Sequence, residues 1–221
     1  MKTFTELQEG VYDPNIFKAI FLAGGPGSGK SYVVRKTTGG LGMKIVNSDD
    51  IYEKMLNDAG LETTPEDIYS DKGQEIRVKA KAVTKRMQGN FLDGRLGVII
   101  DGTGKDYDKI ARQVSGLKNI GYDCYMIFVN TSLDTAQERN KMRKRTLPEK
   151  EVETMWKGVQ QNIGKFQRLF GTSNMVIVDN NNAGEDVFEK VWKRIMLLVK
   201  KKVANHLAKK WIAQELAKKK R

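Results

Sequence analysis

The sequence predicts an α/β protein in which helices flank a central parallel sheet of five strands, with a basic helical extension at the C-terminus. The first observation is a set of short apolar runs of strand character that alternate with helical stretches. The runs lie at residues 16–23, 43–47, 96–100, 124–129 and 175–178. The second is that polar residues follow each run directly. Because parallel strands end at one edge of a sheet, we expect these polar residues to meet there.

The first run leads into the most informative motif of the chain. Residues 24–31 read Gly-Gly-Pro-Gly-Ser-Gly-Lys-Ser, which matches G-x-x-x-x-G-K-[ST], and residues 32–36 can start a helix. When a strand leads through a glycine-rich turn into a helix, backbone N–H groups and the helix dipole point at a phosphate. This context predicts the P-loop NTPase fold and a site for ATP or GTP. The alternative is a glycine-rich turn that carries Lys-Ser by chance.

Each residue of this phosphate loop has an expected role. Lys30 is expected to reach the β- and γ-phosphates, and the hydroxyl of Ser31 to ligate Mg²⁺. The remaining nucleotide-binding positions are Gly25, Gly27, Ser28 and Gly29. Here the glycines leave room for the backbone to approach the anion. ATP and Mg²⁺ are therefore the predicted cofactors.

The second run ends at two aspartates. A phosphate loop alone does not separate a kinase from an ATPase or GTPase, but a kinase also needs a carboxylate that accepts the proton of the attacking hydroxyl. We interpret Asp49 as this base and Asp50 as a substrate contact. The alternative is that Ser48 or Asp49 caps the helix that follows.

Residues 51–95 are predicted to be mostly helical, with Thr64 as a cap and Pro65 at the first position of a helix. The third run then ends at Asp101-Gly102-Thr103-Gly104. We expect Asp101 to hold Mg²⁺ through water and Thr103 to contact the acceptor. The alternative is a plain turn at the end of a strand.

A basic segment follows the fourth run. Arg139 and Arg143 are four residues apart, so they share one helix face and are expected to close over the nucleotide as a lid. Their guanidinium groups suit the charge that develops on a transferred phosphoryl group. The alternative is a solvated basic helix. Cys124, inside the fourth run, is expected to be a buried core thiol and not a nucleophile.

Apolar residues recur every three or four positions from Phe188 to Trp211, which predicts an amphipathic helix, with one long helix as an open alternative, before the basic end of the chain. The net charge is +12, but residues 186–221 hold twelve Lys or Arg and three acids, so this segment carries +9 and the rest only +3. A near-neutral body argues against binding of residues 1–185 along the phosphate backbone of a nucleic acid. The basic tail is expected to contact a partner, an anionic surface or nucleic acid.

These patterns divide the chain into an N-terminal tail (1–15), a P-loop kinase domain (16–185) and a C-terminal amphipathic helix with a basic tail (186–221). No apolar run approaches the roughly 18 residues that span a bilayer. The N-terminus lacks the apolar region of a secretory signal. With its single cysteine, the protein is expected to be cytoplasmic.

Taken together, the phosphate loop, Asn47-Ser48-Asp49-Asp50 and the Arg139–Arg143 pair before a proline resemble the kinase domain of phage polynucleotide kinases, which phosphorylate 5′-hydroxyl ends. Asp101-Gly102-Thr103 and Gly121-Tyr122 are more similar to the zeta-toxin kinases, which phosphorylate a sugar nucleotide. The likeness covers residues 16–182. It implies Lys30 and Ser31 as nucleotide and Mg²⁺ contacts, Asp49 as base, and the arginine pair as lid.

Two positions depart from the polynucleotide kinases. Tyr52 stands where they carry an arginine for substrate phosphate, and Gly102 stands where they carry an aspartate. The resemblance therefore extends to the residues that bind the phosphate donor but not to those that bind the acceptor. A nucleic acid, a nucleotide and a sugar nucleotide all stay open as acceptors. A second class of function is a nucleotide-dependent binding or assembly module, an ATPase whose basic tail engages a partner.

The opening segment carries a further resemblance. Leu7-Gln8-Glu9 followed by Gly10 is similar to the cleavage signal of capsid-targeted proteins in large tailed phages. This likeness implies a phage-encoded protein, located in the host cytoplasm or the virion. The alternative is an exposed tail.

Overall fold

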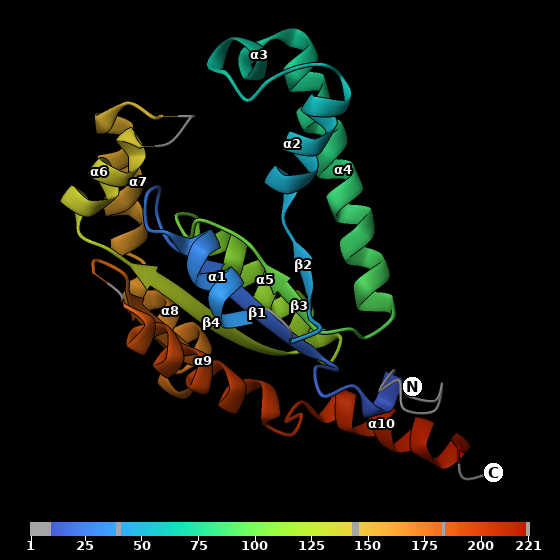
Figure 1. Cartoon of the computed structure of the whole chain (residues 1–221). Helices are drawn as coiled ribbons and strands as arrows, with labels where there is room; N and C mark the ends of the chain where they lie inside the picture. Colours follow the sequence, from blue (N-terminus) through green and yellow to red (C-terminus); the bar gives the residue numbers. More distant parts are fainter. Residues whose placement is uncertain (1–9, 39–40, 143–145, 183, 220–221) are drawn as a thin grey trace.

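A parallel sheet lies at the centre of the protein (Figure 1). The computed structural model describes residues 10–38, 41–142, 146–182 and 184–219. In these residues the strands are β1 (Lys18–Ala23), β2 (Lys44–Val46), β3 (Val98–Ile100), β4 (Asp123–Asn130) and β5 (Met175–Asp179). Their order is β2-β3-β1-β4-β5, and every neighbouring pair is parallel. The predicted sheet is confirmed, and each apolar run supplies one strand.

β1 lies in the middle of the sheet. All six of its residues are buried. Ala19 pairs with Val98 of β3 on one side and with Cys124 of β4 on the other. After β1 the chain builds the β2–β3 half of the sheet, and it then crosses to the other side of β1 for β4 and β5. The carboxyl end of β1 is therefore the switch point at which open α/β sheets bind ligands.

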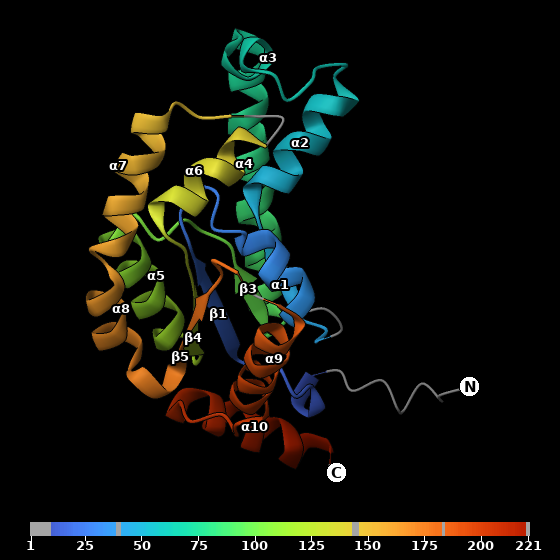
Figure 2. The same cartoon turned by 60° about the vertical axis from the view of Figure 1, so that its left-hand side comes forward.

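Helices cover both faces of the sheet. The α-helices are α1 (Lys30–Thr38), α2 (Ser48–Asp58), α3 (Pro65–Tyr69), α4 (Asp71–Asp93), α5 (Tyr107–Asn119), α6 (Leu133–Lys141), α7 (Glu149–Gln160), α8 (Ile163–Phe170), α9 (Glu185–Lys200) and α10 (His206–Lys219), and the short 3₁₀ helices are η2 (Gly10–Tyr12) and η3 (Thr172–Asn174). α1 and α9 cover one face, and α5 and α8 cover the other (Figure 2). Both faces of a parallel sheet must be covered because its strands are apolar on both sides.

Helices α2, α3 and α4 form an arm that stands away from the sheet beyond β2 (Figure 1). The helical prediction for residues 51–95 is confirmed, and Thr64 caps α3 by accepting a hydrogen bond from Asp67 N at 3.3 Å. The arm has an apolar cluster of its own, separate from those on the two sheet faces. This cluster contains Tyr52, Leu56, Ile68, Ile76 and Ala80.

The apolar repeat near the C-terminus is divided between two helices. α9 ends at Lys200 and α10 begins at His206, so the possibility of one long helix is wrong. The carboxylate of Asp123 explains the break, because it accepts hydrogen bonds from Ala204 N at 2.6 Å and Asn205 N at 3.1 Å. These amides would otherwise belong to a continuous helix.

Helix α10 docks on the protein through an aromatic contact. The rings of Trp211 and Phe17 meet edge to face with centroids 5.5 Å apart, and Phe17 makes the same kind of contact with Tyr122. Ala208, on the same helix, is fully buried. Phe17 has a φ of 56°, a strained conformation for a bulky residue. This aromatic cluster holds Phe17 in place and joins α10 to the amino-terminal edge of the sheet.

We expect Trp211→Ala to lower the free energy of unfolding by about 2 kcal/mol or more, because the substitution leaves a gap against Phe17. Urea unfolding measures this change. Trp192→Ala on α9 is the matched control: its ring is 41% exposed, so its effect should stay within about 0.5 kcal/mol. Equal effects of the two substitutions would contradict the docking role of Trp211.

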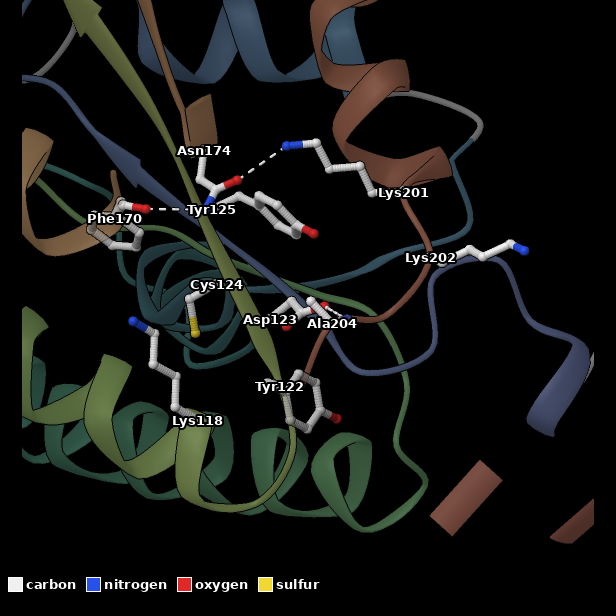
Figure 3. A pocket seen from close by; sticks show the side chains of 10 residues that line it. All are labelled: Lys118, Tyr122, Asp123, Cys124, Tyr125, Phe170, Asn174, Lys201, Lys202 and Ala204. Atoms are coloured by element: carbon white, nitrogen blue, oxygen red, sulfur yellow. Dashed lines mark hydrogen bonds between the residues drawn. The ribbon is translucent and has the colours of Figure 1, made fainter. Parts of the chain in front are cut away.

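A cavity of about 270 Å³ lies at the amino-terminal edge of the sheet, beside the start of β4 (Figure 3). Lys118, Tyr125 and Lys201 line it, and the side chain of Lys202 points away. Lys201 donates to Asn174 Oδ1 at 3.2 Å, and the carboxylate of Asp123 bonds the α9–α10 connection. The polar groups that line the cavity thus join parts of the chain to one another. The cavity lies at the edge of the sheet opposite the phosphate loop.

Cys124 borders this cavity and is buried, as predicted. Burial raises the pKa of its thiol to about 12. Because the thiolate is the reactive form, iodoacetamide at pH 8 should alkylate the native protein at least about 100-fold more slowly than the urea-unfolded chain. Mass spectrometry of timed samples measures the two rates. Similar rates would show that Cys124 is not protected by the fold.

Some sequence predictions lie outside the described residues: residues 7–9 of the cleavage-signal resemblance, Arg143 of the lid, and residues 220–221 of the basic end. Among the helices that the structure describes, none is long and apolar enough to cross a membrane.

Candidate active site

The phosphate loop runs from the end of β1 to the start of α1, as predicted. Gly27 and Gly29 have φ values of +73° and +74°, which L side chains rarely adopt. A Cβ at Gly27 would collide with the backbone of Ala136 in α6, and one at Gly29 would collide with the amide of Asn180. The glycines thus let the loop pass directly beneath α6 and the end of β5.

Two polar atoms beside the loop are buried without a hydrogen-bond partner in the described structure. They are Ser28 Oγ and Arg139 Nη1. The Nη1 atom lies 3.6 Å from the position that a Cβ of Gly29 would occupy. Buried polar groups in native proteins are normally paired. A guanidinium donor, a hydroxyl and the first amides of α1 together fit the oxygens of a phosphate.

Lys30 forms an ion pair with Asp101, which follows β3. The two side chains are only 15% and 13% exposed. Gly24 N also donates to Thr103 O at 3.0 Å, so the segment after β3 supports the loop by its backbone as well. The structure therefore brings Lys30, Asp101 and Thr103 together at one edge of the sheet.

Asn47 caps α2, so the alternative that Ser48 or Asp49 is the cap is wrong. Asn47 has extended backbone angles, and its Oδ1 accepts a hydrogen bond from Asp49 N at 2.8 Å. A cap must precede the first helical residue, and Ser48 is already helical. The carboxylate of Asp49 is therefore not used for capping, and Asp49 is exposed.

Asp50 is exposed like Asp49, and its carboxylate is bound by the residue that caps the helix. Its Oδ1 accepts a hydrogen bond from Asn47 Nδ2 at 2.9 Å. Partial burial, followed by the negative charges of Asp101 and Asp49, raises the pKa of Asp50 above its usual range, although Asn47 and Lys30 act in the opposite direction. These charge effects link Asp50 to the Lys30–Asp101 pair, so both aspartates after β2 belong to the edge that carries the phosphate loop.

The turn after β5 connects the phosphate loop with α6. Asn180 is buried and donates to Ser28 O at 2.7 Å. Arg139 Nη2 donates to Asn181 O at 3.0 Å, and Ser132 N donates to Asn181 Oδ1 at 2.7 Å. Sequence reasoning identified these asparagines only as polar residues after a strand. Their position at the shared sheet edge was the available signal.

α7 is a further part of the site that sequence reasoning missed. The position of a Cβ on Gly25 would be 3.7 Å from Trp156 Cα, so α7 lies against the start of the loop. Trp156 Nε1 donates to Thr131 O at 2.8 Å, and Gln160 Nε2 donates to Asn130 Oδ1 at 2.7 Å. The α7 segment carries no motif, so only its packing places it here.

The described residues contain no cluster of three His, Cys, Asp or Glu side chains that could hold a metal ion. The site instead offers the hydroxyl of Ser31, which is exposed in the first turn of α1, and the carboxylate of Asp101. Such a set fits Mg²⁺, which keeps several waters and is usually held by one or two protein oxygens together with substrate phosphates.

Residues 20–161, more than half of the chain, match the family described as AAA domain. No curated protein matches the sequence.

Several solved structures share the fold at low sequence identity. A gluconokinase from Sinorhizobium meliloti matches with a TM-score of 0.52 and 16% identity, over 84% of this chain and 95% of that chain. A chain of the PezAT toxin–antitoxin system of Streptococcus pneumoniae matches with a TM-score of 0.54 and 14% identity, over 84% of this chain and 85% of that one.

A chain of the Pnkp1/Rnl/Hen1 RNA repair complex matches with a TM-score of 0.53 and 18% identity, over 74% of this chain and 49% of that one. This chain therefore spans only about half the length of that relative. The phosphate loop, both aspartates after β2, Asp101 and Arg139 all lie inside the family match. The chain belongs to the AAA domain family and has a P-loop fold.

Proposed function

We propose that the protein is an ATP-dependent kinase that transfers the γ-phosphoryl group to a hydroxyl of a nucleic acid, a nucleotide or a sugar nucleotide. The observation that carries this proposal is a complete phosphate loop at the same sheet edge as an aspartate, Asp49, that neither caps its helix nor forms an ion pair in the described structure. Similar solved structures include a gluconokinase and an RNA repair complex, and this supports a phosphotransferase.

The phosphate loop would bind the nucleotide. Gly25, Gly27, Ser28 and Gly29 would present backbone and hydroxyl groups to the phosphates, and Lys30 would exchange Asp101 for β- and γ-phosphate oxygens. Ser31 would ligate Mg²⁺, and Asp101 would hold it through water. When bound, Mg²⁺ supplies charge neutralisation for the phosphate oxygens.

Asp49 would act as the general base. It accepts the proton of the acceptor hydroxyl as that oxygen bonds to the γ-phosphorus and the bond to the β-phosphate oxygen breaks, which releases ADP. Arg139, with Arg143 as its lid partner, would stabilise the charge on the transferred group, and Nη1 of Arg139 is already without a partner beside the loop. Asp50 and Thr103 would contact the acceptor.

The second candidate is a nucleotide-dependent binding or assembly module. The exposed lysines of α10 and of the connection between α9 and α10 favour it, because these segments lie at the opposite edge of the sheet from the phosphate loop (Figure 1). In this module ATP would order the lid and the basic tail would bind a partner or an anionic surface. For either function we propose a cytoplasmic protein.

A phosphoryl-transfer assay with γ-³²P-ATP and Mg²⁺ separates these candidates. The acceptors are 5′-hydroxyl DNA and RNA, nucleosides and sugar nucleotides, and Lys30→Ala is the inactive control. Label on an acceptor would establish the kinase and its substrate class. Free phosphate as the only product with every acceptor would favour the binding module.

We expect Asp49→Asn to lower the turnover of phosphoryl transfer by about 10²- to 10⁴-fold, because the amide cannot accept the hydroxyl proton. The affinity for ATP should stay the same, as measured by titration of the purified protein. Asp58→Asn, at the other end of α2 and also exposed, is the matched control and should keep full turnover. Loss of ATP affinity in Asp49→Asn would indicate a structural role instead.

Gly27→Ala should abolish nucleotide binding, because the new methyl group meets the backbone of Ala136 and the residue has a positive φ. Calorimetric titration with ATP measures the change. Gly116→Ala in α5 is the control: no atom lies within 4 Å of its Cβ position, and a helical alanine favours the native helix. A Gly27→Ala protein that bound ATP normally would exclude this loop as the phosphate site.

A further inference from the structure

The arm carries an arginine that makes a cation–π contact with a buried aromatic ring. The guanidinium carbon of Arg77, on α4, lies 5.4 Å from the centre of the Tyr52 ring on α2. Tyr52 is only 3% exposed, and its hydroxyl donates to Ile68 O at 3.5 Å. A cation over the face of an aromatic ring is attracted to it. The Tyr52 ring therefore favours this position of the Arg77 guanidinium.

Arg77 has no anionic partner within the described structure. Among the residues that the structure describes, no carboxylate forms an ion pair with Arg77 and no group accepts a hydrogen bond from its guanidinium, and the side chain is half-buried. Other cations near the site differ in this respect, since Lys30 is paired with Asp101 and Arg139 bonds Asn181. A positioned guanidinium without a counter-ion is suited to bind an external phosphate through two N–H groups.

The position of Arg77 links it to the proposed base. Tyr52 follows Asp49 by three residues on α2, so their side chains are neighbours on that helix, about 5–6 Å apart at Cβ. On α4, Arg77 lies next to Ile76, which is buried in the arm cluster against α2. The two figures agree that α2 and α4 stand side by side, on the opposite side of the phosphate loop from α6 and α7 (Figures 1 and 2).

We propose that Arg77 is a specificity-determining residue that binds a phosphate group carried by the acceptor, distinct from the phosphoryl group that is transferred. This inference rests on the proposed kinase function and narrows its substrate class to phosphate-bearing acceptors. The phosphate can belong to a nucleotide or to the first phosphodiester of a nucleic-acid end. Lys81, one helical turn after Arg77 and exposed, adds positive charge to the same side of α4.

The affinity of the protein for four acceptor probes is measured first, while a non-hydrolysable ATP analogue and Mg²⁺ occupy the phosphate loop. The probes are adenosine, adenosine 3′-monophosphate, a UDP-sugar and a 5′-hydroxyl oligonucleotide. The proteins are the wild type, Arg77→Gln, Arg77→Lys and Arg86→Gln. Arg86 is the matched control because it is an exposed arginine on the same helix. Thermal unfolding of each variant confirms that the arm is folded.

We expect at least one phosphate-bearing probe to bind the wild type, and Arg77→Gln to weaken its binding about 10- to 100-fold, which is the loss expected for charge-assisted hydrogen bonds. The affinity of Arg77→Lys should lie between those of the wild type and Arg77→Gln, since lysine keeps the charge but loses the planar group that can donate two hydrogen bonds to one phosphate. Arg86→Gln should match the wild type, and any binding of adenosine should be the same in all four proteins. Which phosphate-bearing probe responds distinguishes a nucleotide from a nucleic-acid end.

Absence of binding by every phosphate-bearing probe, or equal binding to the wild type and Arg77→Gln, would overturn the inference. The transfer assay separates its failure from failure of the kinase proposal. If the protein phosphorylates an acceptor that carries no phosphate, and Arg77→Gln does not change the rate, the kinase proposal stands and the proposed role of Arg77 is wrong. Binding that depends on Arg77, without transfer to any acceptor, would retain this phosphate site and remove the kinase.

Discussion

The ion pair between Lys30 and Asp101 is the interaction on which the site depends. It joins the phosphate loop, which follows β1, to the end of β3, and both side chains are largely buried. Removal of one member of a buried pair leaves an uncompensated charge, which is strongly unfavourable. Asp101 therefore gives Lys30 a negative partner of the kind that a phosphate would also supply. Its charge, together with burial, also raises the pKa of Asp50. The loop, the β3 turn and the start of α2 thus form one electrostatic unit.

Around this unit the protein has a base formed by the sheet and the phosphate loop, and the arm extends from this base. β1 is buried between β3 and β4, and the loop glycines pass directly beneath α6 and Asn180. The arm is built differently, since its apolar cluster is separate from the clusters on the sheet faces. The foot of α4 joins the main core through Phe91 and Leu92, and the outer part of the arm, with its own small core, can move more easily than a segment inside the main core. An arm of this kind suits the acceptor side of the proposed reaction, where closure must exclude water.

The basic C-terminal segment is part of the fold as well as a carrier of charge. α9 supplies Phe188 and Ile195 to the core on one sheet face, and α10 docks through Trp211. Arg95 lies over the rings of both Phe17 and Trp211, and Lys219 lies over Tyr12. Some of the positive charge is therefore used to attach the helix to the amino-terminal edge of the sheet. The other lysines of α10 are exposed and form the basic region that the second candidate function requires.

The sequence by itself determined the strands, the phosphate loop, the Thr64 cap and the burial of Cys124, because each depends on local periodicity or on the backbone needs of a few adjacent residues. Tertiary structure alone decided the rest. The helix break at residues 201–205 requires the carboxylate of Asp123, about 80 positions earlier, and the link from Ser28 to Asn180 spans 152 residues. The cation–π contact of Arg77 with Tyr52 likewise depends on how α4 packs against α2. Contacts between residues that are distant in the chain leave no local pattern, so only the packing of the folded chain reveals them.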